Sequence, residues 1–169
     1  YVFSLTPPLL EASKRFGLTR QHLLSILYLV SIAVKDFEVT RLLMEKKYVE
    51  DQLAYALQVL ATSQEDLTAW KIAQSNPTTV TLYATGRLKD ASGAMAAGEV
   101  LKQSLVEEFR KVFSHLPVFI LERFLYLVDA LPRHMKGDTL QNVNTAVRLL
   151  VETFIEPVFT QFLGQSSTY

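Results

Sequence analysis

A long, strongly hydrophobic stretch covers residues 116–131 and reads LPVFILERFLYLVDAL. Its charged residues are Glu122, Arg123 and Asp129. Pro117 stands where the first turn of a helix accepts proline, and Pro132 stands where we expect the helix to end. A helix that is apolar on nearly every side is buried among other helices. The pattern therefore predicts that residues 116–131 form the central helix of an all-α fold.

Apolar residues recur at helical spacing in several other segments, so we expect most of the chain to be helical. Residues 20–35 are predicted to form the second most buried helix, because apolar side chains cover most of its circumference. Four predicted helix starts carry capping residues, namely Thr6, Thr19, Ser63, and Asp138 with Gln141. Gly17 and Pro157 mark predicted ends or kinks. Further helices are expected over residues 7–16, 48–61, 64–72, 99–114 and 139–156.

Residues 76–98 interrupt this helical pattern. The run TTVTLY at residues 78–83 is rich in β-branched and aromatic side chains, which favour a strand. No partner strand is visible elsewhere in the chain, so a helix or an extended loop is the better interpretation. The glycines at 86, 93 and 98, with alanines between them, are typical of a flexible or closely packed connection. We therefore expect a flexible or irregular connection around residues 76–98.

These patterns predict one all-helical domain over residues 1–169, with seven to nine helices packed around residues 116–131. A closed multi-helix bundle explains the spacing of the apolar residues. A short array of armadillo- or HEAT-like helical hairpins is the alternative, because residues 23–66 read as helix, turn, helix with a weak internal similarity.

The charge balance argues against a nucleic-acid partner. The chain has 17 basic and 17 acidic residues, and its basic residues form no cluster larger than a pair such as Lys46 and Lys47. Nucleic-acid surfaces need clustered basic residues interleaved with aromatic ones. We therefore expect protein partners, which include neighbouring domains of the same chain, and no nucleic acid.

Cysteine is absent from the sequence, which excludes disulfides, thiolate metal sites and cysteine nucleophiles. The longest apolar run, at residues 23–34, is too short to cross a membrane as a helix. We expect an intracellular, cytoplasmic location without a membrane span. Because residue 1 is tyrosine and not methionine, we also consider that the sequence is a fragment of a longer protein.

No motif for catalysis, a cofactor or a metal is complete. Gly93 and Gly98 have the spacing of a phosphate-binding loop, but Glu99 stands where that motif needs lysine. His22, His115 and His134 lack partners at metal-ligand spacing. We therefore expect no catalytic residues, no cofactor and no metal.

Part of the chain loosely resembles the GTPase-activating domains of the Rho family. The resemblance rests on the sequence GRLKDASG at residues 86–93, on the Leu-Pro pairs at 116–117 and 131–132, and on Leu140. It covers about half of the chain and leaves residues 1–75 outside. The resemblance implies an all-helical regulator of a small GTPase that uses an arginine in a loop to stabilise phosphoryl transfer, and Arg87 would be that arginine.

The sequence favours a non-catalytic protein-interaction or scaffold domain. The alternatives are a regulatory domain that acts on a small GTPase, and an enzyme with an unrecognised site. Large apolar side chains in two segments, 70–88 and 157–169, are the candidate anchors for a partner, because tyrosine and tryptophan often anchor interfaces. The partner-binding candidates are Trp70, Tyr83, Arg87, Phe159 and Phe162. This hypothesis predicts that Phe159 and Phe162 are more than a quarter exposed.

Overall fold

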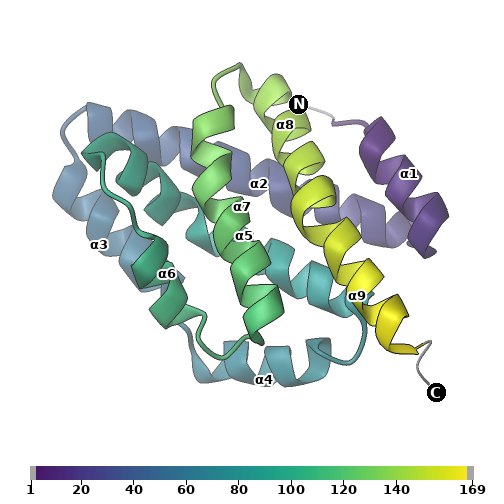
Figure 1. Cartoon of the computed structure of the whole chain (residues 1–169). Coiled ribbons are helices and arrows are strands. Elements are labelled where there is room, and N and C mark those ends of the chain that lie inside the picture. The colour runs from purple at the N-terminus through teal and green to yellow at the C-terminus, as the bar shows by residue number, and fades with distance from the viewer. Residues whose placement is uncertain (1–2, 167–169) are drawn as a thin grey trace.

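The structure, a computed structural model, describes residues 3–166 and is all-helical in that range, with no strand (Figure 1). Its elements are α1 (Pro7–Phe16), α2 (Arg20–Glu45), α3 (Val49–Leu60), α4 (Gln64–Ala73), α5 (Pro77–Leu101), α6 (Val106–Val112), α7 (Val118–His134), α8 (Thr139–Leu150), the π-helical turn η1 (Val151–Ile155) and α9 (Glu156–Ser166). The last three follow one another without a break and form one long rod. The predicted all-α bundle is therefore confirmed.

The expectation of an irregular connection at residues 76–98 is wrong, because this segment lies in α5, a continuous helix of 25 residues. The Asn76 side chain accepts a hydrogen bond from a backbone N–H in the first turn, and Pro77 follows where proline is tolerated. Tertiary burial then outweighs the strand preference of the β-branched residues. The buried Thr85 hydroxyl donates a hydrogen bond to the Thr81 carbonyl at 2.7 Å, so burial leaves it satisfied.

The centre of the bundle is α5, against which α2, α3, α4, α7, η1 and α9 all pack. Its buried alanines, Ala84, Ala91, Ala94, Ala96 and Ala97, let these neighbours come close. At Gly93 an added Cβ would lie 3.2 Å from the Cβ of Ala56 on α3. By contrast α7, the predicted centre, is buried on one face and exposed at Val118 and Tyr126 on the other. The core is therefore organised around α5, with α7 on one side of it.

The helix α2 is longer than predicted, because it continues through Asp36 to Glu45 and spans 26 residues. It runs behind α7 and α8 in the view of Figure 1. The Glu38 carboxylate accepts hydrogen bonds from the Thr139 hydroxyl and the Asn142 amide, both at 2.7 Å. These bonds fix the start of α8 to α2, although the joined residues stand up to 104 positions apart in the sequence.

The helix predicted over residues 99–114 is divided in two. The first part is the end of α5, which stops where Lys102 adopts a left-handed conformation, with φ of 53°. The Gln103 N–H then bonds to the Gly98 carbonyl at 2.9 Å, and a Cβ on Gly98 would lie 3.0 Å from the Gln103 carbonyl oxygen. This tight turn needs glycine at position 98 and directs the chain into the short helix α6.

The predicted helix starts at Thr19, Ser63 and Asp138 are confirmed, and each has the reciprocal hydrogen bonds of a capping box. The start at Thr6 is confirmed as well, but the Thr6 side chain makes no capping hydrogen bond there. The helix α7 continues through Pro132 for two more residues. Proline is tolerated so close to the end of the helix, because its missing N–H removes few of the helix's backbone hydrogen bonds. Pro157 does not stop its helix either. The π-helical turn η1 directly precedes it, and such turns absorb local misfit within a continuing helix.

Phe124 tests whether α7 contributes to the core. It is fully buried, and its ring meets the Phe113 ring edge-on with centroids 4.7 Å apart. We expect Phe124→Ala to lower the free energy of unfolding by about 3–5 kcal/mol, because the truncation leaves a cavity. Urea denaturation measures this loss. Tyr126→Ala on the exposed face of the same helix is the control, and we expect it to cost less than about 1 kcal/mol. Equal costs for the two variants would show that α7 is not part of the core.

Candidate functional site

The residues that the sequence singled out lie in two places. Trp70, Tyr83 and Arg87 meet where α4 packs on α5, and Phe159 and Phe162 lie on α9. The structure adds two small clefts and the exposed face of α2 as further candidates.

Arg87 is the centre of a polar cluster inside the fold. Its Nη1 lies 3.0 Å from the Oδ2 of Asp90 on α5 and 3.1 Å from the Oδ1 of Asp66 on α4. Its Nη2 donates to the Leu60 carbonyl at the end of α3 at 2.8 Å, and its guanidinium stands 5.2 Å from the centroid of the Phe113 ring. The side chain is 6% exposed. One arginine thus ties together α3, α4, α5 and the connection between α6 and α7.

An aromatic group adjoins Arg87. The Tyr83 hydroxyl lies 2.9 Å from Nε2 of His115, and the Trp70 ring centroid lies 5.3 Å from that of Tyr83 and 6.4 Å from that of His115. Burial lowers the pKa of His115, and the positive charge of Arg87 lowers it further. The folded state therefore favours a neutral imidazole, whose Nε2 accepts the Tyr83 hydroxyl hydrogen when the proton is on Nδ1.

Through these contacts Trp70, Tyr83 and Arg87 stabilise the fold. Trp70 and Arg87 are buried, and Tyr83 is half-buried against the core. The Rho-family resemblance implied that Arg87 lies in a loop, and this is wrong, because Arg87 lies in the middle of α5 between two carboxylates. An arginine that reaches into a partner's phosphoryl-transfer site has to be free to extend.

The expected exposure of Phe159 is also wrong. Phe159 is 4% exposed and stacks on Phe16 of α1 with ring centroids 4.7 Å apart. Phe162 is half-buried against the core. The chain stays helical beyond Pro157, which lets α9 lay its apolar face on α1 and α5. Tyr169, the last residue of the predicted segment, lies outside the described residues.

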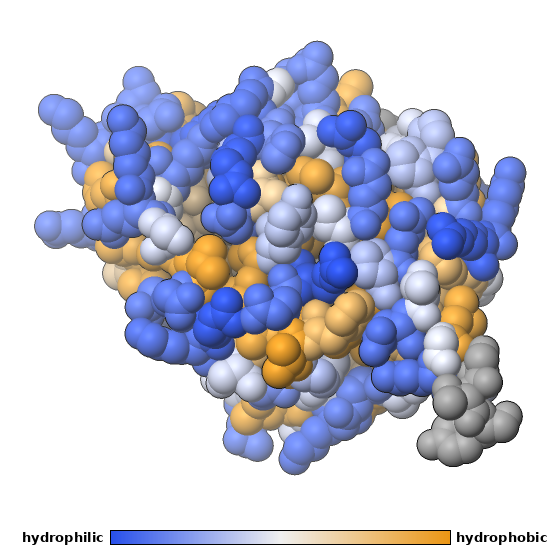
Figure 2. Space-filling view, in the orientation of Figure 1, coloured by the Kyte–Doolittle hydropathy of each residue, from blue (hydrophilic) through white to orange (hydrophobic). Residues whose placement is uncertain are grey.

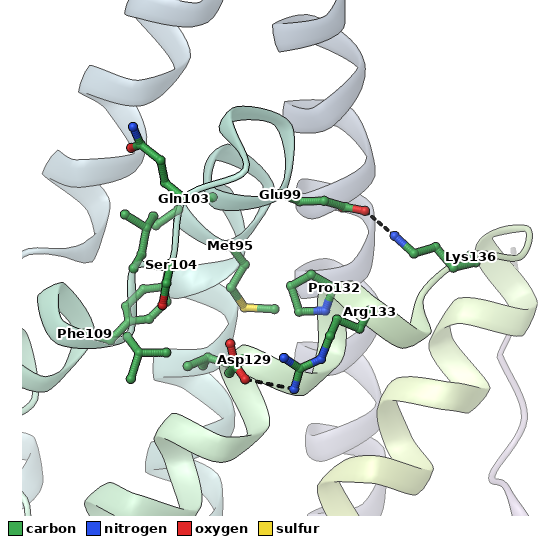
Figure 3. Close-up of a pocket in the computed structure, with 14 residues that line it drawn as sticks. Met95, Glu99, Gln103, Ser104, Phe109, Asp129, Pro132, Arg133 and Lys136 are labelled. Carbon is green, nitrogen blue, oxygen red and sulfur yellow. Dashed lines mark hydrogen bonds and ion pairs between the residues drawn. The ribbon is translucent and has the colours of Figure 1, made fainter.

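A small cavity of about 190 Å³ lies between the end of α5, the loop at residues 102–105, α6 and the second half of α7 (Figure 3). Met95 and Phe109 contribute to its apolar wall. At its rim Glu99 pairs with Lys136, and Asp129 pairs with Arg133 at 2.8 Å. The charged side chains at the rim of the cavity are thus paired with one another. The cavity is also below the roughly 300–1,000 Å³ that is usual for ligand sites, so it suits at most a small molecule.

A second cleft of about 210 Å³ lies between α2, α3 and α5. It holds Asp36, Lys89 and Asp90, and the last two pair at 3.0 Å. Burial raises the pKa of Asp36, Lys89 opposes this shift, and the negative charge of Asp90 adds to it. The single positive charge of Lys89 therefore offsets only part of the negative charge of Asp36 and Asp90. Neither cleft, however, brings together free polar groups in the way that acid–base catalysis requires.

The exposed face of α2 is a feature that the sequence analysis missed. Leu24, Tyr28, Val39 and Leu42 are 42%, 64%, 54% and 54% exposed. Their spacing places them on one side of the helix. The apolar side chains that surround most of the helix predicted over residues 20–35 are therefore not all buried. Helical periodicity alone could not show which apolar side stays uncovered. On the face formed by α6 and α7, by comparison, hydrophilic residues surround small apolar patches (Figure 2).

Within residues 3–166 no three acidic or histidine side chains are grouped as metal ligands would be. In the same range no helix is both long and apolar enough to cross a bilayer. Comparisons with protein families, with curated proteins and with solved structures found no match for this chain. The exposed surfaces of the molecule are therefore the remaining guide to its function.

The Arg87 cluster yields a prediction about stability. We expect Arg87→Met to lower the free energy of unfolding by about 3–5 kcal/mol, because Asp66 loses its ion pair, Asp90 keeps only Lys89, and the buried Leu60 carbonyl loses its donor. Denaturant unfolding measures the loss. The triple variant Arg87→Met, Asp66→Asn, Asp90→Asn removes the two carboxylate charges and should recover part of it. A triple variant as unstable as the single one would show that the charges do not matter.

The same cluster predicts two separate steps in the pH dependence of stability. The His115 pKa is lowered from its ordinary 6.5, so the unfolded chain takes up a proton below about pH 6.5 while the folded chain resists it. Stability should therefore decrease as the pH falls below about 7, and His115→Gln should remove this slope in denaturant titrations. No difference in slope between the two proteins would contradict the neutral-imidazole assignment.

Asp66 affects stability in a lower pH range than His115 does. Burial alone would raise its pKa, but hydrogen bonds from the Ser63 N–H and hydroxyl, with the charge of Arg87, lower it below 3.8. Its stabilising effect is present above about pH 4 and is lost as pH falls through the lowered value. Asp66→Asn should therefore flatten the stability profile below about pH 4 and leave the His115 step in place.

Proposed function

We propose that this domain is a non-catalytic protein-interaction module that binds a protein partner through the exposed face of α2. The observation that supports the proposal most is the exposure of Leu24, Tyr28, Val39 and Leu42 on one side of that helix. We define these four residues as the α2 face.

The α2 face is large for a surface without a task. It consists of two apolar pairs, Leu24 with Tyr28 and Val39 with Leu42, and the exposed Lys35 lies between the pairs on the same side of the helix. Residues 24 to 42 span about 27 Å at 1.5 Å per residue. The opposite side of α2 is buried in the core through residues such as Ile26, Val30 and Phe37. A helix needs one apolar side for its own fold, whereas a second one lowers solubility unless another surface covers it.

Neighbouring residues extend this surface. Tyr55 on α3, which is 64% exposed, lines the cleft between α2, α3 and α5 together with Val39. Aromatic side chains at the centre of an apolar area carry a large share of the binding energy in protein interfaces. The two tyrosines, Tyr28 and Tyr55, are therefore the proposed anchors, and a scaffold or docking role follows from a surface of this kind.

The proposal predicts that charges on the α2 face abolish partner binding and spare the fold. We expect Tyr28→Asp with Leu24→Asp to reduce quantitative capture of the protein's partners from cell extract by about tenfold or more, because interface tyrosines contribute about 2 kcal/mol. The melting temperature should stay within a few degrees, since both side chains are exposed in the free domain.

Tyr126→Asp on α7 is the matched control. Tyr126 is also an exposed helical tyrosine, at 56%, and belongs to α7, which lies in front of α2 in Figure 1. We expect this variant to retain capture. If both variants capture the same proteins to the same extent, the α2 face is not the docking surface.

A further inference from the structure

The helix α4 lies at the lower edge of the bundle in Figure 1, and α5 is the neighbour against which it mainly packs. Of the ten residues of α4, two are buried, Trp70 and Ala73. Short irregular segments at residues 61–63 and 74–76 join the helix to α3 and α5. A helix with few buried apolar contacts opens locally at a lower free energy than the helices of a core. The attachment of α4 to the bundle thus depends on few side chains.

Three rings form the contact between α4 and the rest of the fold. The His115 ring lies edge-on to Trp70 of α4 and to Tyr83 of α5, with ring centroids 6.4 Å and 6.3 Å away. The centroids of Trp70 and Tyr83 are 5.3 Å apart. Ring contacts of this kind are favourable at centroid distances up to about 7 Å. We define these three residues as the ring cluster, and it holds α4 against α5.

The groups around His115 determine which form of the imidazole fits this site. Burial and the positive charge of Arg87 on α5 disfavour the imidazolium, whereas the Val112 carbonyl and the Asp66 carboxylate on α4 favour it. The first two effects prevail, so the pKa of His115 is lowered from 6.5. Tyr83 is the remaining titratable neighbour, and burial raises its pKa, so it stays a neutral hydroxyl in acid.

Protonation changes the contact between His115 and Tyr83. A neutral ring accepts the Tyr83 hydroxyl hydrogen at Nε2, 2.9 Å away, whereas an imidazolium has hydrogens on both nitrogens and only donates. The Tyr83 hydroxyl then has to change from donor to acceptor. The new charge also adds to that of the buried Arg87 guanidinium, and like charges repel more strongly away from water. The imidazolium is therefore more stable in solvent than in the ring cluster.

Of the elements around His115, α4 is the one that can move away. Phe113 is fully buried and Leu116 is 6% exposed, so the connection that carries His115 between α6 and α7 is anchored on both sides. Tyr83 belongs to α5, the central helix, which other elements cover along its length. Solvent therefore reaches the His115 ring most readily when α4 withdraws Trp70.

Release of α4 leaves no unpaired charge in the core. Arg87 loses Asp66 but keeps Asp90, 3.0 Å away, and its carbonyl partner at the end of α3, 2.8 Å away. Asp66 is already 25% exposed and moves with α4 into water, where its charge is solvated. Opening of α4 therefore costs the burial of Trp70 and one ion pair, and acid reduces this cost.

We propose that α4 is an acid-released segment, in which protonation of His115 undocks α4 from α5 while the rest of the bundle stays folded. The open state exposes the apolar side of α4, with Trp70 and Ala73, and the Tyr83 ring on α5. The domain thus presents in acid an apolar surface that is hidden at neutral pH. This switch does not involve the α2 face.

Trp70 is the only tryptophan of the chain, so its fluorescence reports on α4. We expect acrylamide quenching of Trp70 to increase, and its emission to move to longer wavelength, as the pH falls below about 6.5. Far-UV circular dichroism should keep most of the helical signal.

Hydrogen exchange measures the same release in the parent protein without any substitution. The opening constant of the α4 amides, corrected for intrinsic exchange, should rise by up to about tenfold per pH unit below about 6.5, because the open state binds one more proton. Amides of α2 and α8 should stay protected. If the α4 amides open equally at pH 7 and in acid, or only together with those of α2 and α8, the proposal is wrong.

Two histidine variants assign the response. His115→Gln keeps a hydrogen-bonding side chain that takes up no proton, and it should remove the change in Trp70. His134→Gln is the matched control, since His134 lies in the last turn of α7 against the Ala130 carbonyl, and it should keep the change. Parent-like Trp70 emission at neutral pH verifies that both variants are folded.

Two outcomes of the fluorescence experiment would also overturn the proposal. One is a response that His115→Gln leaves in place, because another group would then cause it. The other is a fall in Trp70 intensity without a change in acrylamide quenching. In that case the imidazolium quenches a tryptophan that stays docked, and α4 is not released.

Discussion

The close packing of six elements around α5 is the constraint on which the rest of the structure depends. A helix surrounded on most sides has little room for long side chains, and α5 provides alanine and glycine where its neighbours approach. The contact between Gly93 and Ala56 sets the distance of α3, and the turn at Gly98 sets the direction of α6. Small residues let α3 approach α5 closely at Gly93, whereas at Gly86 an added Cβ would meet no atom within 4 Å.

Arg87 complements this packing with charge. A buried arginine is tolerated when its charge is matched, and here two carboxylates, a backbone carbonyl and an aromatic ring surround it. The cluster lies beside the end of α3, where Arg87 donates a hydrogen bond to the Leu60 carbonyl. This bond fixes the position at which α3 ends against α5.

Much of the fold could be predicted from the sequence, because the relevant interactions are local. Capping boxes at Thr19, Ser63 and Asp138 depend on residues three positions apart, and the apolar stripe of α7 depends on helical spacing. The identity of the central helix could not be predicted in this way. The threonines of α5 favour a strand when considered alone, and their helical state depends on burial against segments distant in the sequence.

The candidate site was harder to predict for the same reason. Exposure of Tyr28 and burial of Phe159 are decided by which helices cover them, and this is a property of the tertiary structure. Trp70, Tyr83 and Arg87 were predicted to bind a partner. The structure brings them together, and their contacts with Asp66 and His115 join them to the packing of α4 on α5. A large aromatic or charged residue is thus an ambiguous indicator of a binding site until its contacts in the folded structure are known.

The helices α2 and α5 run parallel, because Asp36 lies in one cleft with Lys89 and, further along both helices, Arg41 lies 4.0 Å from Glu99. This arrangement has a consequence for how the chain folds. Two parallel helices cannot be joined by a short turn, so α3 and α4 form a crossover between them. The bonds from Glu38 to the start of α8 close an even longer loop. Loop closure costs entropy before such contacts form, and folding rates decrease as contacting residues become more distant in the sequence. This bundle should therefore fold more slowly than an up-and-down bundle of equal length, and its slowest step should be the meeting of α2 with α5.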